Sequence, residues 1–464
     1  MECTGCIARK VLVLASGFVN LPVSDGSHVC RRQQARPGIQ GHSGIAAALA
    51  ITTLGAPDRN KCPRHPVADF CRDFEAGACW RERSQMSRST PVKIAHVVLS
   101  LGPGGMENGV VNLARSLPPE KFTVRICCLE SGGEFVRRLP DPGWATVLGK
   151  PPGLSVRAAW QLAGWLRREK PAVIHTHNLG PLIYAVWAKW FGATGVILHG
   201  EHGMITEAES SGFHLRLRRL LYMACRKVHT VSHGLRHYYI ERGFPADKIV
   251  AVVNGVDTSR FVPGDKMAAR KALGLPESGI VVGMVASLQR RKRHREMIEA
   301  FEQCAARHEN ARLLLLGGDG QESGNVLRQI AASPQSKRIH WAGYQEDTRL
   351  FYQAMDLLAV PSVNEGLSNA ALEAMASGVP VLAHSACGNP DIIENELDGF
   401  VANLATTGEL FQQLERAISS PEQLIQMGKK ARAKVVAHYS LGAMVSNYAS
   451  LYLELAGCGL GGGS

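Results

Sequence analysis

The sequence predicts an α/β protein with two parallel β-sheets, and three observations support this fold class. Short apolar runs alternate with longer stretches of helical periodicity, which is the pattern of βαβ units. The series of runs starts near residue 92 and starts again near residue 280. The chain has 464 residues, 45% of them hydrophobic and 20% charged, which is enough for two separate cores. We therefore expect two Rossmann-like domains.

The elements follow one another in order along the chain. The first series of expected strands is Lys93–Leu99, Thr123–Leu129, Ala172–His175, Gly195–Leu198 and Lys227–Val231, with helices such as Val110–Ser116 and Val156–Lys170 between them. The second series is Ile280–Ala286, Arg312–Leu316, Ile339–Ala342, Leu357–Val360 and Val379–Ala383. A last long helix is expected over Gly442–Leu455. Because helical segments separate the strands, both sheets should be parallel.

Residues 1–90 differ from the rest of the chain. Half of the 12 cysteines lie there, among Arg, Pro and Gly and with little periodicity. Cys71 and Cys79 copy the first half of a CCCH zinc finger, but Trp80–Pro91 contains neither the third cysteine nor the histidine. A zinc site from Cys3, Cys6, Cys62, His65, Cys71 and Cys79 is the alternative. We expect a disordered extension, or a translation start that belongs at Met86.

Composition narrows the classes of function. No run approaches the ~18 apolar residues of a spanning helix, and Val11–Val19 is too short for a secretory signal. The remaining cysteines are scattered, as is typical of reduced thiols in a cytosolic enzyme. A net charge of +12 suits phosphorylated ligands, an anionic membrane surface or nucleic acid. Aromatic stacking motifs are missing, so nucleic acid is not expected as a partner.

The most informative segment runs from Pro361 to Val381. Two glutamates, Glu365 and Glu373, flank seven residues across a turn from a buried strand to a helix capped by Ser368 or Asn369. Such a turn offers free helix amides for a phosphate and two carboxylates for sugar hydroxyls. A nucleotide-sugar presents these groups together. The alternative is a capped surface helix with two solvated carboxylates.

This segment, E-G-L-S-N-A-A-L-E-A-M-A-S-G-V-P-V, resembles the E-x7-E signature of the retaining family 4 glycosyltransferases. The resemblance covers about residues 92–457 and implies the GT-B fold, with two facing Rossmann-like domains and a C-terminal crossover helix. It implies that Glu365 contacts the transferred sugar beside the amides of Gly366 and Leu367, that Ser368 starts the phosphate-binding helix, and that Glu373 holds the ribose. The domains it implies are 91–262 for the acceptor, 263–440 for the donor, 441–457 for the crossover helix, and 458–464 as a flexible tail.

Four glycine-containing segments resemble the donor-binding segments of that family. Gly102–Glu107 follows the first strand, and its Gly104 and Gly105 let backbone amides approach a phosphate. Asn254–Asp257 reads N-G-V-D, which places Asn254 at the cleft. Gly317–Gly320 resembles the turn near the nucleotide, with Gly318 in it, and Trp341–Tyr344 resembles the segment close to the nucleobase. Each of these loops also reads as an ordinary tight turn.

The basic segment 287–293 is expected to supply the positive charge that binds the donor diphosphate. Lys292 matches the family's lysine that stabilises the donor diphosphate, but Ser287 stands where the family has an arginine. Arg290 or Arg291 could supply the missing charge. For Arg291 and Arg293, a solvated loop position is the favoured interpretation.

Histidines follow two strands of the first domain. His199–Gly203 reads H-G-E-H-G, a loop of some bacterial polysaccharide transferases, which implies that His202 contacts the sugar or acceptor. His175 and His177 could line the acceptor pocket, and a purely structural role is the alternative. The spacing shows no tetrahedral ligand set, and no D-x-D motif has a plausible setting, so we expect no metal.

The segment Phe213–Lys227 interleaves apolar residues with four arginines. Such a basic amphipathic helix can lie on an anionic leaflet, although a scaffold helix with a solvated basic face is slightly favoured.

The sequence thus predicts a retaining, metal-independent glycosyltransferase without cofactor. It would move a sugar from a nucleotide-diphosphate-sugar to a glycan or lipid-linked acceptor, in polysaccharide or cell-envelope synthesis. We expect it in the cytoplasm, peripherally at the inner face of the plasma membrane. The alternatives are another GT-B activity, such as an epimerase or a phosphorylase, and a non-catalytic sugar-nucleotide or RNA-binding protein.

Overall fold

The structure is a computed structural model that describes residues 90–386 and 388–460. The predictions for the cysteine-rich segment, including its zinc ligands, and for the C-terminal tail beyond residue 460 lie outside the described residues. Among the described residues, no helix has the length and apolar character needed to cross a membrane.

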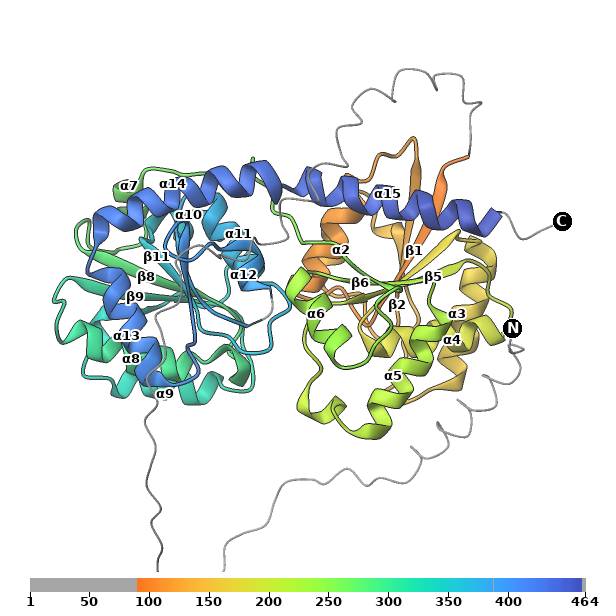
Figure 1. The fold of residues 1–464 in the computed structure, drawn as a ribbon, viewed down its shortest axis with the longest axis horizontal. Helices are drawn as coiled ribbons and strands as arrows, with labels where there is room; N and C mark the ends of the chain where they lie inside the picture. The colour runs from red at the N-terminus through yellow and green to blue at the C-terminus, as the bar shows by residue number, and fades with distance from the viewer. Residues whose placement is uncertain (1–89, 387, 461–464) are drawn as a thin grey trace, which may run out of the picture. The chain divides into compact units, whose positions relative to one another are not determined.

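The first domain contains a seven-stranded parallel sheet in the order β3-β2-β1-β4-β5-β6-β7 (Figure 1). Its strands are β1 Val92–Val98, β2 Phe122–Cys128, β3 Ala145–Val147, β4 Val173–His177, β5 Val196–Glu201, β6 Lys227–Thr230 and β7 Ile249–Ala251. Its α-helices are α2 Gly105–Ser116, α3 Val156–Glu169, α4 Leu179–Trp190, α5 Gly212–Ala224 and α6 His233–Glu241. The strand order reverses between β1 and β4, and ligands of open α/β sheets bind at the carboxyl ends of strands at such a point.

The second domain contains a six-stranded parallel sheet in the order β10-β9-β8-β11-β12-β13. Its strands are β8 Ile280–Val285, β9 Ala311–Leu316, β10 Ile339–Trp341, β11 Leu357–Val360, β12 Val381–His384 and β13 Gly399–Ala402. Its α-helices are α7 Lys266–Ala272, α8 His294–Ala305, α9 Ser323–Ala332, α10 Arg349–Ala354, α11 Asn369–Ala376, α12 Asn389–Ile392, α13 Thr407–Ile418 and α14 Pro421–His438. Here the strand order reverses between β8 and β11.

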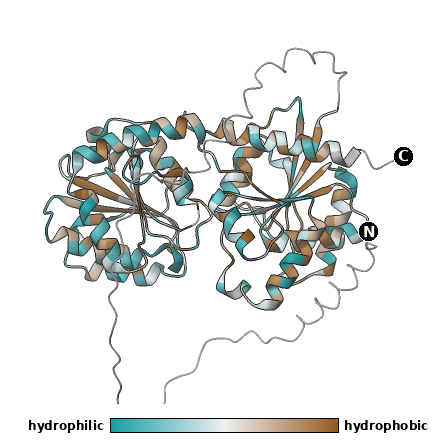
Figure 2. Cartoon of the chain, viewed as in Figure 1, coloured by the Kyte–Doolittle hydropathy of each residue, from teal (hydrophilic) through white to brown (hydrophobic). Residues whose placement is uncertain are grey.

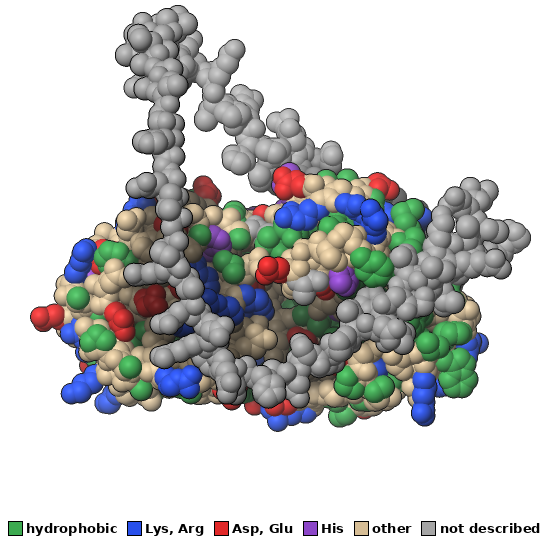
Figure 3. Space-filling view, turned by 90° about the horizontal axis from the view of Figure 1, so that it is seen from below, with side chains coloured by type: hydrophobic (Ala, Val, Ile, Leu, Met, Phe, Trp, Pro, Cys, Tyr) green, Lys and Arg blue, Asp and Glu red, His purple; other side chains and the backbone are tan. Residues whose placement is uncertain are grey.

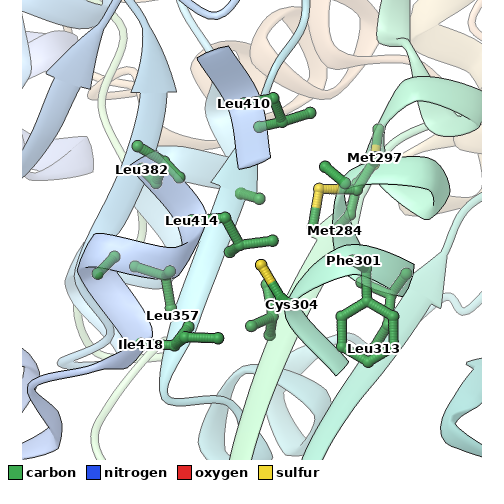
Figure 4. Packing of buried hydrophobic residues seen from close by; sticks show 14 of the residues in the cluster. Met284, Met297, Phe301, Cys304, Leu313, Leu357, Leu382, Leu410, Leu414 and Ile418 are labelled. Carbon is green, nitrogen blue, oxygen red and sulfur yellow. The ribbon is translucent and has the colours of Figure 1, made fainter. Parts of the chain in front are cut away.

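The strands of the second sheet are mostly hydrophobic, whereas β4, β5 and β6 of the first sheet also contain buried polar residues, and the helices contain both hydrophilic and hydrophobic residues (Figure 2). In the second domain, β8, β9 and β11 pack against α8 and α13, with Met284, Phe301, Leu313 and Leu414 fully or almost fully buried (Figure 4). This core fixes the positions of β8 and β11, whose carboxyl ends lead into the site.

Helix α15, Leu441–Leu460, completes the core of the first domain. Its residues Met444, Tyr448, Leu451, Tyr452 and Leu455 pack in one cluster with β1 and α2. Tyr452 is fully buried. The predicted last helix is therefore confirmed as the element that crosses back to the first domain.

The ten predicted strands are all present, with ends that differ by a few residues. The sequence analysis missed β3, β7 and β13, which have only three or four residues. All three lie at an edge of their sheet and are only partly buried.

Candidate functional site

The loop between β11 and α11 carries the first glutamate of the signature. Asn364 has φ 63°, a left-handed conformation that asparagine tolerates better than most residues. The next residue, Glu365, is 9% exposed. The Ser368 hydroxyl then accepts a hydrogen bond from the amide of Ala371, which confirms the predicted cap. The first amides of an α-helix have no partner within the helix, so the first turn of α11 offers such donors to a ligand.

Two basic side chains converge on Glu365. The Lys292 ammonium forms an ion pair with Glu365 Oε1, and the Arg291 guanidinium lies 3.3 Å from the same oxygen. Burial lowers the pKa of Lys292, whereas the Glu365 carboxylate raises it. Lys292 and Arg291 lie on a short 3-10 helix that follows β8, and Glu365 follows β11. The two strands at which the sheet order reverses therefore supply a carboxylate and two cations to one point.

The structure distinguishes the three arginines of this segment. Arg291 reaches Glu365, although its side chain is 44% exposed. Arg290 is exposed and lies outside this ion-pair network. Arg293 is 7% exposed and donates to the backbone carbonyls of Leu404 and Ala405. The expectation of a solvated position was therefore wrong for Arg293, which ties the loop to the residues after β13.

The loop that contains His202 lies against the loop that contains Glu365. Gly203 pairs with Glu365 in an isolated β-bridge. A Cβ atom on Gly366 would lie 2.8 Å from the carbonyl carbon of His202, so this close approach requires glycine. The Ser232 hydroxyl donates to the Gly366 carbonyl at 2.7 Å. These contacts bring the first-domain histidine next to the second-domain glutamate.

A second connection joins the two domains through Asn369, the first residue of α11. Its Nδ2 donates to the carbonyl of Gly105 at 3.0 Å, and its Oδ1 accepts from Asn254 Nδ2 at 3.0 Å. Gly104 is the N-terminal cap position of α2. The glycine loop and Asn254 therefore lie at the N-terminus of α11, and the connecting role of Asn369 was not predicted from the sequence.

Gly318 lies in the turn after β9. Its carbonyl accepts a hydrogen bond from the amide of Leu288 at 3.0 Å. A Cβ on the neighbouring Gly320 would lie 2.6 Å from the carbonyl carbon of Leu288. The turn is thus packed on the segment that leads to Lys292.

Two family models match the chain in succession. The model of Glycosyltransferase Family 4 matches residues 103–260, and that of Glycosyl transferases group 1 matches residues 265–434. Together they include every strand of the two sheets except β1, and every residue of the site described above. The chain belongs to the group 1 glycosyltransferases. Its fold is GT-B, and it is a transferase.

Several proteins are similar to this glycosyltransferase. It is 24% identical over 389 residues to the UDP-Gal:alpha-D-GlcNAc-diphosphoundecaprenol alpha-1,3-galactosyltransferase of Escherichia coli, covering 80% of this chain and 98% of the relative. It is 26% identical to the N-acetyl-alpha-D-glucosaminyl L-malate synthase of Bacillus anthracis, covering 66% of this chain and 80% of the relative. Among solved structures, Anabaena HepE in complex with UDP-glucose superposes with a TM-score of 0.69 at 20% identity, covering 78% of this chain and 99% of HepE.

The second signature glutamate of the transferase, Glu373, has a hydrogen-bonded partner. The Tyr352 hydroxyl on α10 donates to Glu373 Oε2 at 2.8 Å. Burial raises the pKa of Glu373 to about 7, and the Tyr352 hydrogen bond only partly offsets this. The sequence analysis missed Tyr352, because it lies 21 residues earlier on another helix. No motif connects the two.

Replacing Glu373 by glutamine is expected to change how stability depends on pH. Because the folded-state pKa of about 7 lies above the ordinary 4.5, the wild-type residue stabilises the fold below pH 4.5. This contribution is lost as the pH rises through 7. Relative to wild type, the variant should gain about 2 kcal/mol of unfolding free energy between pH 5 and pH 8. Urea unfolding at both pH values measures it.

The exposed Glu454 provides the control for this experiment, because Glu454→Gln should show no such gain. If the unfolding free energy of both variants changes equally, relative to wild type, between pH 5 and pH 8, Glu373 is an ordinary, solvated carboxylate.

The glutamate of the H-G-E-H-G loop has a structural role. Glu201 is 3% exposed and pairs with Arg218 of α5, 2% exposed. It also accepts from the Tyr222 hydroxyl at 2.6 Å and lies 3.1 Å from His199 Nε2. The expectation that all four arginines of Phe213–Lys227 form a solvated basic face was therefore wrong for Arg218.

A pocket opens in the first domain, between α2 and α15. It is lined by Gly105, Met106, Gly109, Val110, Leu113, His177, His202, Asn254, Met444 and Tyr448. Burial lowers the pKa of His202 to about 4, so its imidazole is neutral near pH 7. His202 therefore offers this pocket a hydrogen-bonding group without a charge.

Proposed function

We propose that this glycosyltransferase is a retaining enzyme that moves a sugar from a nucleotide-diphosphate-sugar to a glycan or lipid-linked acceptor, without a metal ion on the donor. The observation that carries the proposal is the convergence of Lys292 and Arg291 on Glu365, beside the N-terminus of α11. The relatives support the substrate class. The Escherichia coli relative is named for UDP-Gal and a diphosphoundecaprenol acceptor, and HepE was solved with UDP-glucose.

Positive charge in this site suits a departing diphosphate. Lys292, Arg291, the amides of Gly104 and Gly105, and the N-terminus of α11 would stabilise the negative charge that develops as the sugar–phosphate bond breaks. Without donor, Glu365 neutralises the two cations. When the diphosphate binds, it replaces Glu365 as their counterion, and the carboxylate is released toward the sugar.

The transfer itself would take place on one face of the sugar. The acceptor hydroxyl attacks from the side that the diphosphate leaves, and a phosphate oxygen takes its proton. No protein base is then required. Glu365 would orient the sugar and support its positive charge, and the neutral His202 would hydrogen-bond to the sugar or acceptor from the first domain. Glu373 would bind the ribose of the donor.

Turnover of purified full-length protein tests the proposal. A panel of nucleotide-sugars is incubated with EDTA, with and without lipid-linked or oligosaccharide acceptors, and both released nucleotide and the anomeric configuration of the product are measured. We expect acceptor-dependent release that survives the chelator and a product with retained configuration. Inverted product, or loss of donor turnover in EDTA, would contradict the proposal. Product formed without any acceptor would favour an epimerase or a phosphorylase.

We propose that Arg291 replaces the arginine that the family has at the position of Ser287. Arg291→Ala should lower kcat/KM for the donor about 10- to 100-fold, because one of the two cations near the diphosphate is removed. Arg290→Ala is the matched control, since its exposed side chain is outside the ion-pair network of Glu365. Steady-state kinetics with varied donor measure both. A larger effect in Arg290→Ala would assign the role to Arg290 instead.

We further propose that α5 holds the enzyme on an anionic inner membrane surface, where a lipid-linked acceptor for polysaccharide or cell-envelope synthesis would lie. Arg216 and Arg219 of α5 are exposed, as is its apolar Met223. Figure 3 shows basic and acidic side chains interspersed over the described part of one face, so the excess positive charge is not confined to a single patch there.

Sedimentation with lipid vesicles measures this contact. Arg216→Ala should weaken partitioning onto vesicles with anionic lipid about five-fold, corresponding to ~1 kcal/mol per basic side chain near the surface. Binding to uncharged vesicles should stay the same. Equal binding of wild type and variant to anionic vesicles would exclude α5 from the contact.

A further inference from the structure

Three neighbouring strands bring one histidine each to the same end of the first sheet. His177 is the last residue of β4, His202 directly follows β5, and His229 lies in β6. The strand register aligns His177 with Gly200, and Gly200 with His229. The three imidazoles therefore gather above one glycine of the middle strand.

The space above Gly200 is filled by imidazole nitrogens. A Cβ atom on Gly200 would lie 2.9 Å from Cε1 of His229 and 3.1 Å from Nε2 of His202. Gly200 lies within the extended β5, so it is the space rather than the backbone conformation that requires glycine. Any side chain at this position would fill the place where the rings meet.

The nitrogens are close enough to share one ion. One nitrogen of each of His177, His202 and His229 lies within 4.8 Å of the others. His177 Nδ1 and His202 Nε2 are 3.0 Å apart. Three nitrogens bound to a zinc ion at ~2.0–2.1 Å in tetrahedral geometry lie a little over 3 Å apart, so small rearrangements would suffice.

The second ring nitrogens of His177 and His229 have partners that would orient these two ligands, and His229 Nε2 also lies 2.7 Å from His175 Nε2. His177 Nε2 lies 2.9 Å from His96 Nδ1, and His229 Nδ1 lies 3.3 Å from the Tyr448 hydroxyl. Such outer contacts orient metal-binding histidines.

We propose that His177, His202 and His229 bind one divalent transition-metal ion of the zinc class, with its open coordination position toward the pocket between α2 and α15. Two of the three ligands, His177 and His202, line that pocket. Imidazole ligands suit zinc, copper and nickel rather than magnesium or calcium. The neighbouring Glu201 carboxylate is engaged with Arg218, His199 and Tyr222 and is not a ligand.

The proposed metal site is separate from the donor-binding site, at which we expect no metal. The three histidines belong to the first domain, whereas the cations proposed for the diphosphate, Lys292 and Arg291, belong to the second. The inference does not depend on the proposed transferase reaction, because its test measures metal binding alone.

Cobalt binding to full-length protein tests the site. Chelator-treated protein is titrated with Co²⁺, and the visible spectrum and the number of bound ions are measured for wild type and Gly200→Ala. We expect wild type to bind one more Co²⁺ ion per chain than Gly200→Ala does. This additional ion should show the d–d absorption bands of a site with nitrogen ligands. Thiolate ligation by cysteines outside the described residues would instead give sulfur charge-transfer bands, which should be the same in both proteins.

Two histidine variants complete the experiment. His202→Asn should lower the affinity for the additional ion at least about 100-fold. The control is His237→Asn, which changes a 74% exposed histidine elsewhere and should leave this affinity unchanged. Zn²⁺ should raise the melting temperature of wild type more than that of Gly200→Ala or His202→Asn. If wild type and both site variants bind the same number of ions with the same spectrum, the histidines form only a hydrogen-bonded cluster and the proposal is wrong.

Discussion

Lys292→Ala is expected to lower the turnover number about 10³-fold, with a much smaller change in KM for the donor. The Lys292 ammonium is 16% exposed and paired with Glu365, so it acts in a site from which water is largely excluded. Electrostatic groups in such sites stabilise the charge that develops in the transition state more than they stabilise the bound substrate. Single-turnover measurement of nucleotide release is the appropriate experiment, because it separates chemistry from product release.

Lys430→Ala is the matched control, since it removes an exposed lysine of the same domain and should leave the rate unchanged. The double variant Lys292→Ala/Glu365→Ala should be less impaired than the sum of the two single effects, because the two side chains contact each other. If Lys292→Ala raises KM and leaves the turnover number unchanged, Lys292 serves only donor binding and the proposed leaving-group role is wrong.

Arg218→Ala is expected to destabilise the fold by about 3–5 kcal/mol, the cost of leaving a buried charge without its partner. Glu201 would remain 3% exposed with no cation to balance it. The free energy of unfolding in urea measures the loss. Replacing both members of the pair, as in Glu201→Gln/Arg218→Met, should cost less than Arg218→Ala alone, because no charge is then buried. An effect below about 1 kcal/mol in Arg218→Ala would mean that the pair behaves as a surface ion pair.

The same pair predicts an acid-sensitive fold. Burial alone would raise the pKa of Glu201, but Arg218, His199 and the Tyr222 hydroxyl together lower it well below the ordinary range. Since the folded-state pKa is the lower one, the carboxylate stabilises the fold above the ordinary value of 4.5, and this is lost as the pH falls. Between pH 6 and pH 3, wild type should therefore lose more unfolding free energy than Glu201→Gln. Equal losses would contradict this assignment.

Local pattern was sufficient for much of the fold and for the centre of the site. The segment from β11 to α11 was predicted correctly because strand, cap and helix stop lie within about twenty consecutive residues and each has its own signal. The position of Lys292 on a loop after β8 followed in the same way. The assigned roles of these residues stay predictions.

What the sequence did not reveal depends on contacts between distant segments. Arg293 reaches carbonyls more than 100 residues later, and Arg218 reaches a glutamate on a neighbouring strand. In a linear sequence both read as members of basic, solvated runs. The histidines of β4, β5 and β6 are likewise separated by about 25 residues each, and only the strand register shows that they meet above Gly200. The periodicity of residues within one helix or strand carries no information about contacts with distant elements.

Helix α15 has a consequence for how this protein is made. The ribosome synthesises the seven strands of the first domain before residue 252, but Tyr448 and Tyr452, which fill part of that domain's core, emerge only after the second domain. During synthesis, the apolar surface of the first domain that α15 covers therefore stays exposed until the whole second domain has been translated. Premature termination between α14 and α15 would thus leave the second domain with its full core and the first domain without part of its own, and the truncated product would be a substrate for chaperones and proteases.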